Sequence, residues 1–80
     1  MQTLNLAIAK TISELRQTAG LSQEELGHLA EIHRTYVSQI ERGLKSPTVQ
    51  VLFQIAEALK TQPIEVIQLI EKHHNELQNK

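Results

Sequence analysis

Four polar residues that follow Ile32 are spaced to share one side of a short predicted helix. They are Arg34, Thr35, Ser38 and Gln39. The apolar residues Val37 and Ile40 take the opposite side together with Ile32. Arginine can form two hydrogen bonds to guanine, glutamine can do so to adenine, and a threonine methyl can contact the methyl of thymine. This composition is suited to reading base edges in double-stranded DNA, with an ordinary solvated helix face as the alternative.

A capped helix is predicted immediately before this segment, at about residues 22–30. Ser22 is a good N-cap residue, and Glu25 three positions later completes a capping box. The apolar spacing restarts after Glu31, so one straight helix could not bury all of the apolar residues. The chain is therefore expected to bend near Glu31.

The second helix of this motif is predicted at about residues 34–42. His33 is its N-cap residue, although serine, threonine and aspartate are better caps, and Gly43 follows its end. Two helices of this length across a tight turn form a helix-turn-helix over about residues 22–42. The second helix of such a motif can enter the DNA major groove.

The charge distribution favours contacts with DNA near the second helix. The net charge is −1, which alone argues against a nucleic-acid binder. However, Arg34, Arg42 and Lys45 cluster in and just after this helix, whereas acidic residues dominate the last third of the chain. Polar and basic side chains nearby are candidates for phosphate contacts, which fix register rather than sequence. They are Gln23, Tyr36, Ser38, Arg42, Lys45 and Ser46.

Apolar residues at helical spacing predict three further helices around the motif. The first runs from about Asn5 to Ala19, and Gly20 ends it. Another runs from about Thr48 to Leu59, and the last covers about residues 63–78. The fourth helix is expected to bury Val49, Leu52, Ile55, Ala56 and Leu59. Because 80 residues make one small domain, residues 1–80 are expected to form a compact, all-α, five-helix domain.

The last predicted helix is apolar on two sides, so it needs a partner besides its own domain. Three isoleucines form one stripe, while Val66 and Leu69 form a second flank. His74 and Leu77 continue the spacing as a short dimer seam would. The candidates for a dimer interface are Phe53, Ile64, Ile67, Ile70 and Leu77. For Phe53, an isolated exposed aromatic side chain is an equal alternative.

Composition argues against several other functions. The chain has no cysteine, which suits a reducing cytoplasm, and no apolar run long enough to span a membrane. It also has no aspartate and no acid-base pair with suitable spacing, so an enzyme is a distant third hypothesis and no cofactor is expected. His73 and His74 point about 100° apart on a helix, so no metal site is expected.

Three stretches together resemble one known family. LSQEEL, then HRTYVSQIERG, then a P-x-x-x-x-L-x-x-I-A-x-A-L run make the chain similar to the lambda-repressor/Cro superfamily, the XRE-type regulators. Within it, the chain most resembles the controller proteins of restriction-modification systems. The likeness covers roughly residues 8–67. It implies a lambda-repressor-like fold and a dimer that binds a palindromic operator.

The resemblance also implies particular contacts. In the family, an arginine at the position of Arg16 pairs with the glutamate of I-E-R-G, which is Glu41 in this chain. The alternative is that Arg16 is a solvated surface residue. The side chain of Gln23 would grip the DNA backbone and brace Arg34. Acidic residues near the motif would be candidates for a contact with RNA polymerase. These are Glu24, Glu25 and Glu31.

The chain departs from the family pattern at two positions in the first motif helix and its turn. Gly27 replaces the usual alanine where a small side chain is needed, at a cost of about 1 kcal/mol in helix propensity. Glu31 replaces the usual glycine of the turn. If Glu31 is left-handed, the strain is roughly 1 to 2 kcal/mol.

The resulting hypothesis is a cytoplasmic, dimeric, sequence-specific DNA-binding transcriptional regulator of the controller type. The alternative is an XRE-type antitoxin or phage-type repressor whose last helix binds a different protein. A chain of this length leaves no segment for a small-molecule effector domain, so control would rest on concentration and dimerisation.

Overall fold

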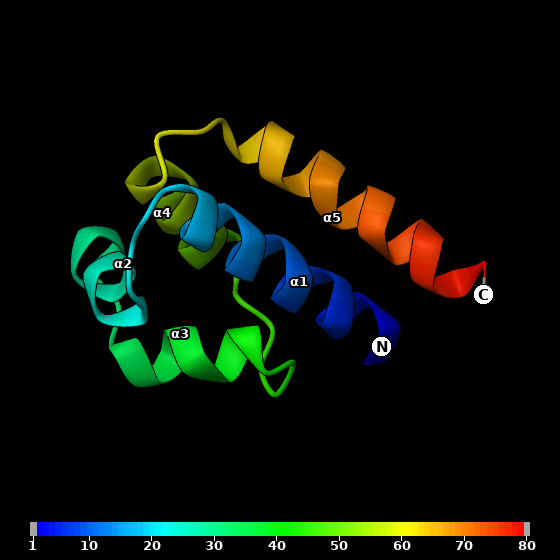
Figure 1. The fold of residues 1–80 in the computed structure, drawn as a ribbon, viewed down its shortest axis with the longest axis horizontal. Coiled ribbons are helices and arrows are strands. Elements are labelled where there is room, and N and C mark those ends of the chain that lie inside the picture. The colour runs from blue at the N-terminus through cyan, green and yellow to red at the C-terminus, as the bar shows by residue number, and fades with distance from the viewer. Residues whose placement is uncertain (1, 80) are drawn as a thin grey trace.

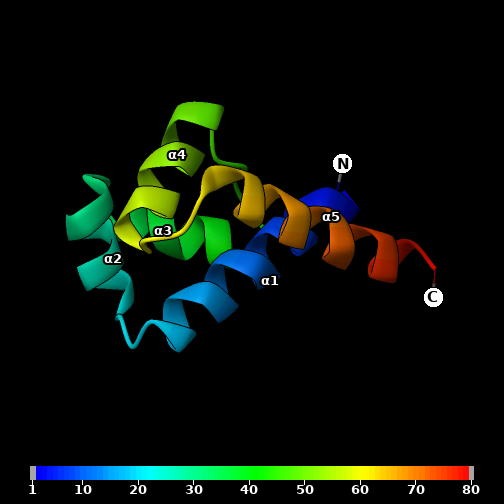
Figure 2. The ribbon, with the colours of Figure 1, turned by 90° about the horizontal axis from the view of Figure 1, so that it is seen from above.

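The computed structural model describes residues 2–79 and confirms the all-α, five-helix prediction. α1 and α5 lie antiparallel, so both ends of the described chain are at the same end of the molecule (Figures 1 and 2). α3 packs on the other side of α1, and α2 packs against α3 and α4 (Figure 1). The helices are α1 (Gln2–Thr18), α2 (Gln23–Ala30), α3 (Arg34–Glu41), α4 (Val49–Ala58) and α5 (Pro63–Gln78).

The first helix begins earlier than predicted, at Gln2 rather than near Asn5. Leu4 packs against the core, which ties the extra turn to the bundle. The end agrees with the prediction. Gly20 has a φ of +74°, and the amide of Leu21 donates to the carbonyl of Arg16 at 3.1 Å, as in a Schellman motif.

Side chains cap both α2 and α4, and the cap of α2 is the one that the sequence predicts. Ser22 Oγ accepts from the Glu25 amide at 3.0 Å, and Glu25 Oε1 accepts from the Ser22 amide at 2.8 Å. Thr48 Oγ1 accepts from the Val51 amide at 3.1 Å. Each bond satisfies an amide that the first helical turn leaves without an intrahelical partner.

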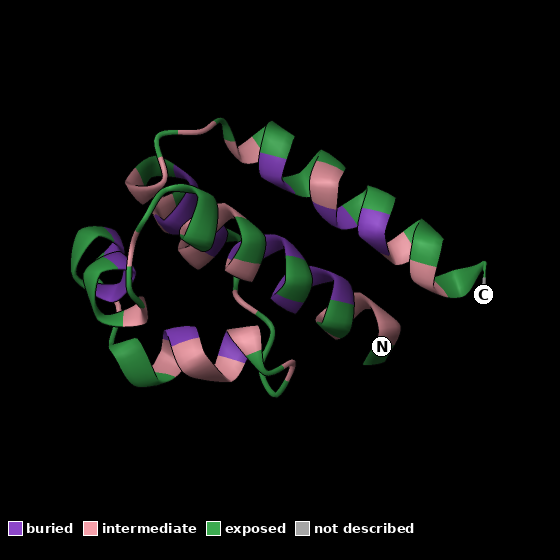
Figure 3. Ribbon diagram, viewed as in Figure 1, coloured by how far each residue is buried: buried purple, intermediate pink, exposed green. Residues whose placement is uncertain are grey.

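The core is formed by buried residues from all five helices, and Figure 3 shows these positions on the sides of the helices that face one another. The prediction that Val49 is buried was wrong, since this side chain is 72% exposed. Val49 is the first residue of α4, and the buried face of this helix begins one turn later, at Leu52. The largest fully buried side chains are Ile12, Leu26, Ile40, Ile55, Val37, Val66 and Thr11.

The helix α5 turns a different face inward from the stripe that the sequence suggested. Val66, Ile70 and His73 are its buried residues, and Leu77 is partly buried against the core. Ile64 and Ile67 are 64% and 46% exposed. Unlike the exposed isoleucines, Ile70 and Leu77 already pack inside their own chain. No helix within residues 2–79 is long and apolar enough to cross a membrane.

Candidate nucleic-acid interface

The short helix α3 has one fully buried side and one open side. Val37 and Ile40 have no exposed surface, and they hold the helix against the core. Arg34 and Thr35 are exposed at its first turn. Ser38 and Gln39, which were predicted to face outward with them, are half-buried. The structure thus presents the N-terminal turn of α3 most openly.

The cap of α3 is the imidazole of His33. Its Nδ1 accepts a hydrogen bond from the Thr35 amide at 3.0 Å. Because a backbone amide can only donate, Nδ1 is the unprotonated nitrogen of this ring and the neutral ring carries its proton on Nε2. The predicted but unusual histidine cap therefore forms a true side-chain cap.

The far end of α3 is fixed by an ion pair with α1. Arg16 Nε donates to Glu41 Oε2 at 2.7 Å, and Arg16 Nη2 donates to Glu41 Oε1 at 3.0 Å. The two side chains are 14% and 6% exposed. Arg16 Nη1 also donates to the carbonyl of Leu21 at 2.7 Å. The hydrogen bond to Glu41 raises the pKa of Arg16 above its ordinary value, so the guanidinium stays charged.

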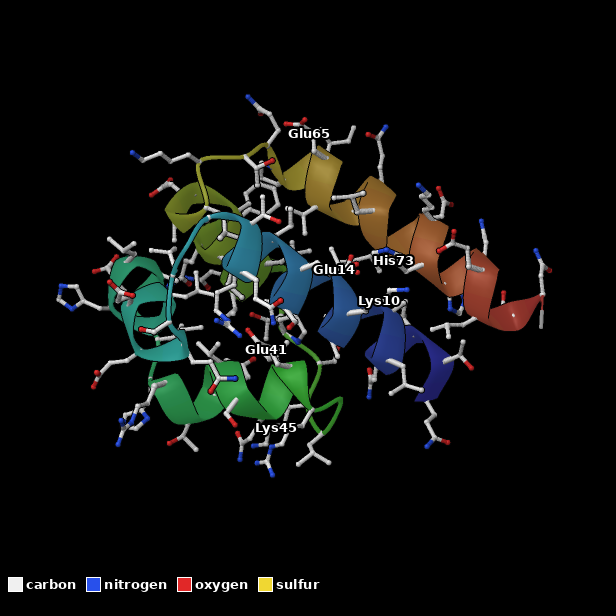
Figure 4. The ribbon with its side chains drawn as sticks, viewed as in Figure 1. Lys10, Glu14, Glu41, Lys45, Glu65 and His73 are labelled. Atoms are coloured by element: carbon white, nitrogen blue, oxygen red, sulfur yellow. The ribbon has the colours of Figure 1, made fainter. Side chains whose placement is uncertain are left out.

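Gln23 belongs to the same network, which differs from the role that the resemblance implied. Its Nε2 donates to Glu41 Oε1 at 3.0 Å rather than bracing Arg34. The partner of Arg34 is instead Glu24, whose Oε2 lies 3.6 Å from Arg34 Nη1. Both of these side chains are mostly exposed, so the pair is open to solvent. Glu41 lies between α3 and α1, where this network links them (Figure 4).

The backbones of α2 and α3 approach closely at Gly27. A Cβ added here would lie 2.8 Å from the carbonyl oxygen of Ile32 and 3.2 Å from the Arg34 amide nitrogen. The prediction that this position needs a small side chain is confirmed, and the space is too small even for alanine. Glu31 has a φ of +60°, so the turn is left-handed as the family pattern requires.

The remaining phosphate candidates lie in α3 or in the few residues that follow it. Arg42, Lys45 and Ser46 are exposed in and after its C-terminal end. Tyr36 is half-buried and packs against the core, so less of its side chain is free than of the others.

Sequence reasoning missed two contacts and one backbone conformation that position the motif or the last helix. Gln54 Nε2 of α4 donates to the carbonyl of Ala30 at 2.8 Å and so satisfies a carbonyl at the end of α2. Lys60 has a φ of +57°, and only its position one residue past a helix end hinted at this. Thr11 Oγ1 lies 2.9 Å from His73 Nδ1 in the α1–α5 interface.

The candidates for a partner contact divide into two groups. Phe53, Ile64 and Ile67 are exposed, and Phe53 lines a surface groove with Gln54 and Pro63 between α4 and the start of α5. Ile70 and Leu77 are withdrawn into the core. Among the described residues, no group of three possible metal ligands is close enough to hold an ion.

This architecture defines a class of protein: a small helical domain that carries a helix-turn-helix with the second helix exposed at its N-terminal turn. The Helix-turn-helix family model, HTH_3, matches residues 12–71 of the chain. The chain belongs to this family of transcriptional regulators.

Restriction-modification controllers are among the similar proteins, as the sequence predicted. Control protein C.BamHI of Bacillus amyloliquefaciens is 31% identical over 65 residues, which are 80% of each protein. The controller protein C.AhdI from Aeromonas hydrophila is 34% identical in its crystal structure, with a TM-score of 0.75 over 78% of this chain and 94% of that chain. Controller protein C.Esp1396I, crystallised as a tetramer with its natural 35 base-pair operator, has a TM-score of 0.80 at 27% identity over 89% and 93% of the two chains.

Longer proteins also contain a similar segment. Two uncharacterised helix-turn-helix regulators of Mycobacterium tuberculosis are 43% identical over 49 residues. The chain spans 35% of their length.

Proposed function

We propose that the chain is a homodimeric transcriptional regulator that binds a palindromic DNA operator and controls a restriction-modification operon. The similarity to C.BamHI, C.AhdI and operator-bound C.Esp1396I supports this function. The observation that carries it is the arrangement of α3, because buried Val37 and Ile40 fix the helix while Arg34 and Thr35 stay open.

The N-terminal turn of α3 would read bases. Recognition helices contact base edges mainly through their N-terminal residues. Arg34 would bond to guanine, Thr35 would contact a thymine methyl, and the half-buried Ser38 and Gln39 would contribute from the next turn. The exposed pair between Arg34 and Glu24 would have to open. An ion pair of this kind is worth at most about 1 kcal/mol, so DNA can displace it.

Phosphate contacts would come from the edges of the same surface. Arg42, Lys45 and Ser46 lie past the last turn of α3, and their exposed side chains would hold the backbone of the operator. Tyr36 and the start of α2 at Gln23 would add contacts. The side-chain amide of Gln23 donates to Glu41. A phosphate would therefore be bound by the backbone amides at the N-terminus of α2, where Gln23 lies.

Dimerisation would use the exposed apolar side chains of α4 and α5. Phe53, Ile64 and Ile67 would be covered by a second copy of the chain. A two-fold axis through this contact would place two α3 helices one DNA turn apart, about 34 Å, which demands a palindromic operator. We therefore assign residues 63–78 to both the core and the dimer interface.

An activating contact with RNA polymerase is a further part of the proposal. Glu24 and Glu25 lie beside Leu29, an exposed leucine of α2 that lines a shallow groove with His28 and with Leu21, which precedes the helix. Glu31 follows at the exposed turn. This acidic and apolar surface is adjacent to the DNA-reading turn, so it would face a polymerase bound next to the operator. The whole activity would be binding in the cytoplasm, without catalysis.

The decisive experiment selects bound sequences from a pool of randomised duplexes and then measures affinity for the selected palindrome and for scrambled DNA. Arg34→Ala should lose about 1–3 kcal/mol on the selected palindrome and leave scrambled DNA nearly unchanged. Lys45→Ala should weaken binding to both duplexes equally. It should also reduce the number of ions released on binding, measured from the salt dependence of the affinity, by about one. The proposal fails if the wild-type protein recovers no preferred sequence. The division of roles fails if the two variants behave alike.

A further inference from the structure

A polar pair is buried in the otherwise apolar contact between α1 and α5. Thr11 and His73 are buried polar residues of the described chain, at 1% and 9% exposed. Thr11 Oγ1 lies 2.8 Å from the carbonyl oxygen of Ala7 and 2.9 Å from His73 Nδ1. His73 extends from α5 toward α1, on the side where Lys10 and Glu14 lie (Figure 4).

The proton positions in this pair follow from its geometry. The Thr11 hydroxyl has one proton, and it donates this proton to the carbonyl of Ala7. His73 Nδ1 must therefore carry a proton and donate it to Thr11 Oγ1. His73 Nε2 lies 3.3 Å from Glu14 Oε1, but Glu14 is 55% exposed and can turn into solvent. Thr11 is thus the contact that fixes the ring.

The helix α5 has two overlapping apolar faces. The face that packs inward contains Val66, Ile70, His73 and Leu77. A second face, which the sequence pattern favours equally, contains Ile67, Ile70, His74 and Leu77. The two faces share two residues, and a rotation of about 50°, half of the angle between successive helical residues, exchanges them. Each face has one histidine, so apolar burial alone distinguishes them poorly.

The two histidines differ in their hydrogen bonds. His73 Nδ1 is bonded to Thr11, whereas His74 Nδ1 is buried and has no hydrogen-bond partner among the described residues. A buried polar group that is satisfied in only one arrangement favours that arrangement over competing packings. The hydrogen bond from His73 to Thr11 therefore separates two faces that are otherwise similar.

We propose that the Thr11–His73 hydrogen bond selects which face of α5 packs on α1, and thereby keeps Ile64 and Ile67 turned outward. The selection of the face is a property of the single chain. Its consequence for a partner rests on the proposed dimer, because a rotated α5 would bury part of the surface assigned to the second copy. His73 is accordingly a positioning residue for the dimer contact.

The chain has no cysteine, so single cysteines can report on this packing. Val66→Cys places a thiol on the inward face of α5, and Leu26→Cys places one in the core on α2. The rate of thiol modification of each is measured with Thr11 and with Thr11→Val. If the pair selects the face, Thr11→Val raises the rate at position 66 about tenfold more than the rate at position 26. Equal increases at both positions, or none at either, overturn the proposal.

Two variants of His73 separate a specific role from a general structural one. In His73→Asn, the side-chain amide nitrogen lies close to the position of Nδ1 and can donate to Thr11. The thiol of Val66→Cys should therefore react within about twofold of the rate that it has when residue 73 is histidine. The longer side chain of His73→Gln reaches the position of Nε2 instead and should behave like Thr11→Val. Equal rates for the two variants contradict the proposal. Thr18→Val, at the exposed end of α1, is the control and should change neither rate.

None of these measurements uses DNA or a dimer. A failure of the proposed regulatory function would leave the modification rates as expected. Failure of face selection would appear as equal rates even in a protein that binds its operator normally. The two outcomes are therefore separate.

Discussion

Arg16 of α1 and Glu41 of α3 form a paired contact in which Nε–Oε2 is 2.7 Å and Nη2–Oε1 is 3.0 Å, both nearly shielded from solvent. Glu41 also accepts from Gln23 of α2, so one carboxylate joins three helices. This contact holds the C-terminal end of α3 against the rest of the domain. Its loss should therefore affect both folding and recognition.

Replacing Glu41 by Gln should destabilise the protein by about 3–5 kcal/mol, because the buried guanidinium of Arg16 loses its counter-charge. Urea unfolding followed by circular dichroism would measure this. The matched control is Glu24→Gln, which removes the exposed pair with Arg34 and should cost at most about 1 kcal/mol. Similar losses in the two variants would show that the buried pair has no special role.

Gly27→Ala should destabilise the protein, although alanine is the better helix former by about 1 kcal/mol. The added methyl would lie 2.8 Å from the Ile32 carbonyl oxygen, which forces the turn away from α2. We expect a net loss of roughly 1–3 kcal/mol in the free energy of unfolding. Gln68→Ala on the exposed side of α5 is the control and should be neutral or stabilising. A gain in stability for Gly27→Ala would contradict the close approach.

Glu31→Gly should stabilise the protein by about 0.5–1 kcal/mol, since glycine adopts the left-handed conformation of this turn without strain. Differential scanning calorimetry would detect the increase in Tm. Glu57→Gly provides the control in the right-handed helix α4, where the same substitution should cost about 1 kcal/mol. Changes of the same sign in both variants would refute this explanation.

Stability should depend on pH through Glu25. Its carboxylate accepts hydrogen bonds from the backbone and side chain of Ser22, and these lower the pKa of Glu25. A lowered pKa contributes stability at higher pH, and this contribution is lost as the pH falls through the lowered value. Between about pH 5 and pH 3, the free energy of unfolding should fall more steeply for the wild-type protein than for Glu25→Gln. Parallel profiles for the two proteins would disprove the contribution of the capping box.

The double variant Ile64→Gln/Ile67→Gln should remain folded and lose self-association, because both side chains are exposed in the single chain. Sedimentation equilibrium would measure the dimer dissociation constant, with an expected weakening of at least about tenfold. Leu44→Gln is the control, since it also removes an exposed apolar side chain but from the loop after α3, outside the proposed interface. If both proteins associate as the wild type does, the dimer contact lies elsewhere.

The sequence predicted the helices well because their boundaries depend on local chemistry. Ser22, Gly20 and Thr48 act within one helical turn, so their types alone define the caps. The first turn of α1 was missed because Thr3 and Asn5 are both possible N-cap residues, although Leu4 continues the apolar spacing of this helix and packs against the core.

The candidate site was less predictable wherever two elements meet. The partner of Gln23 and the withdrawal of Ile70 both depend on how whole helices rotate against each other. A rotation of α5 by less than the angle between two successive residues changes which side of the helix is buried. The apolar spacing does not distinguish these two orientations. The base and phosphate assignments of the residues around α3 stay predictions until DNA binding is measured.

The eight residues of α3 limit how much information the protein can read. A helix of this length rises about 12 Å, comparable to three or four base-pair steps. Four base pairs have about 256 possible sequences, so two copies of α3 distinguish roughly 65,000. This number is smaller than the ~10⁶ competing sites in a genome. Binding to a single site in a genome therefore requires sequence discrimination beyond that of the two α3 helices. It would come from the bendability of base pairs that the protein does not contact, or from additional copies bound at neighbouring sites.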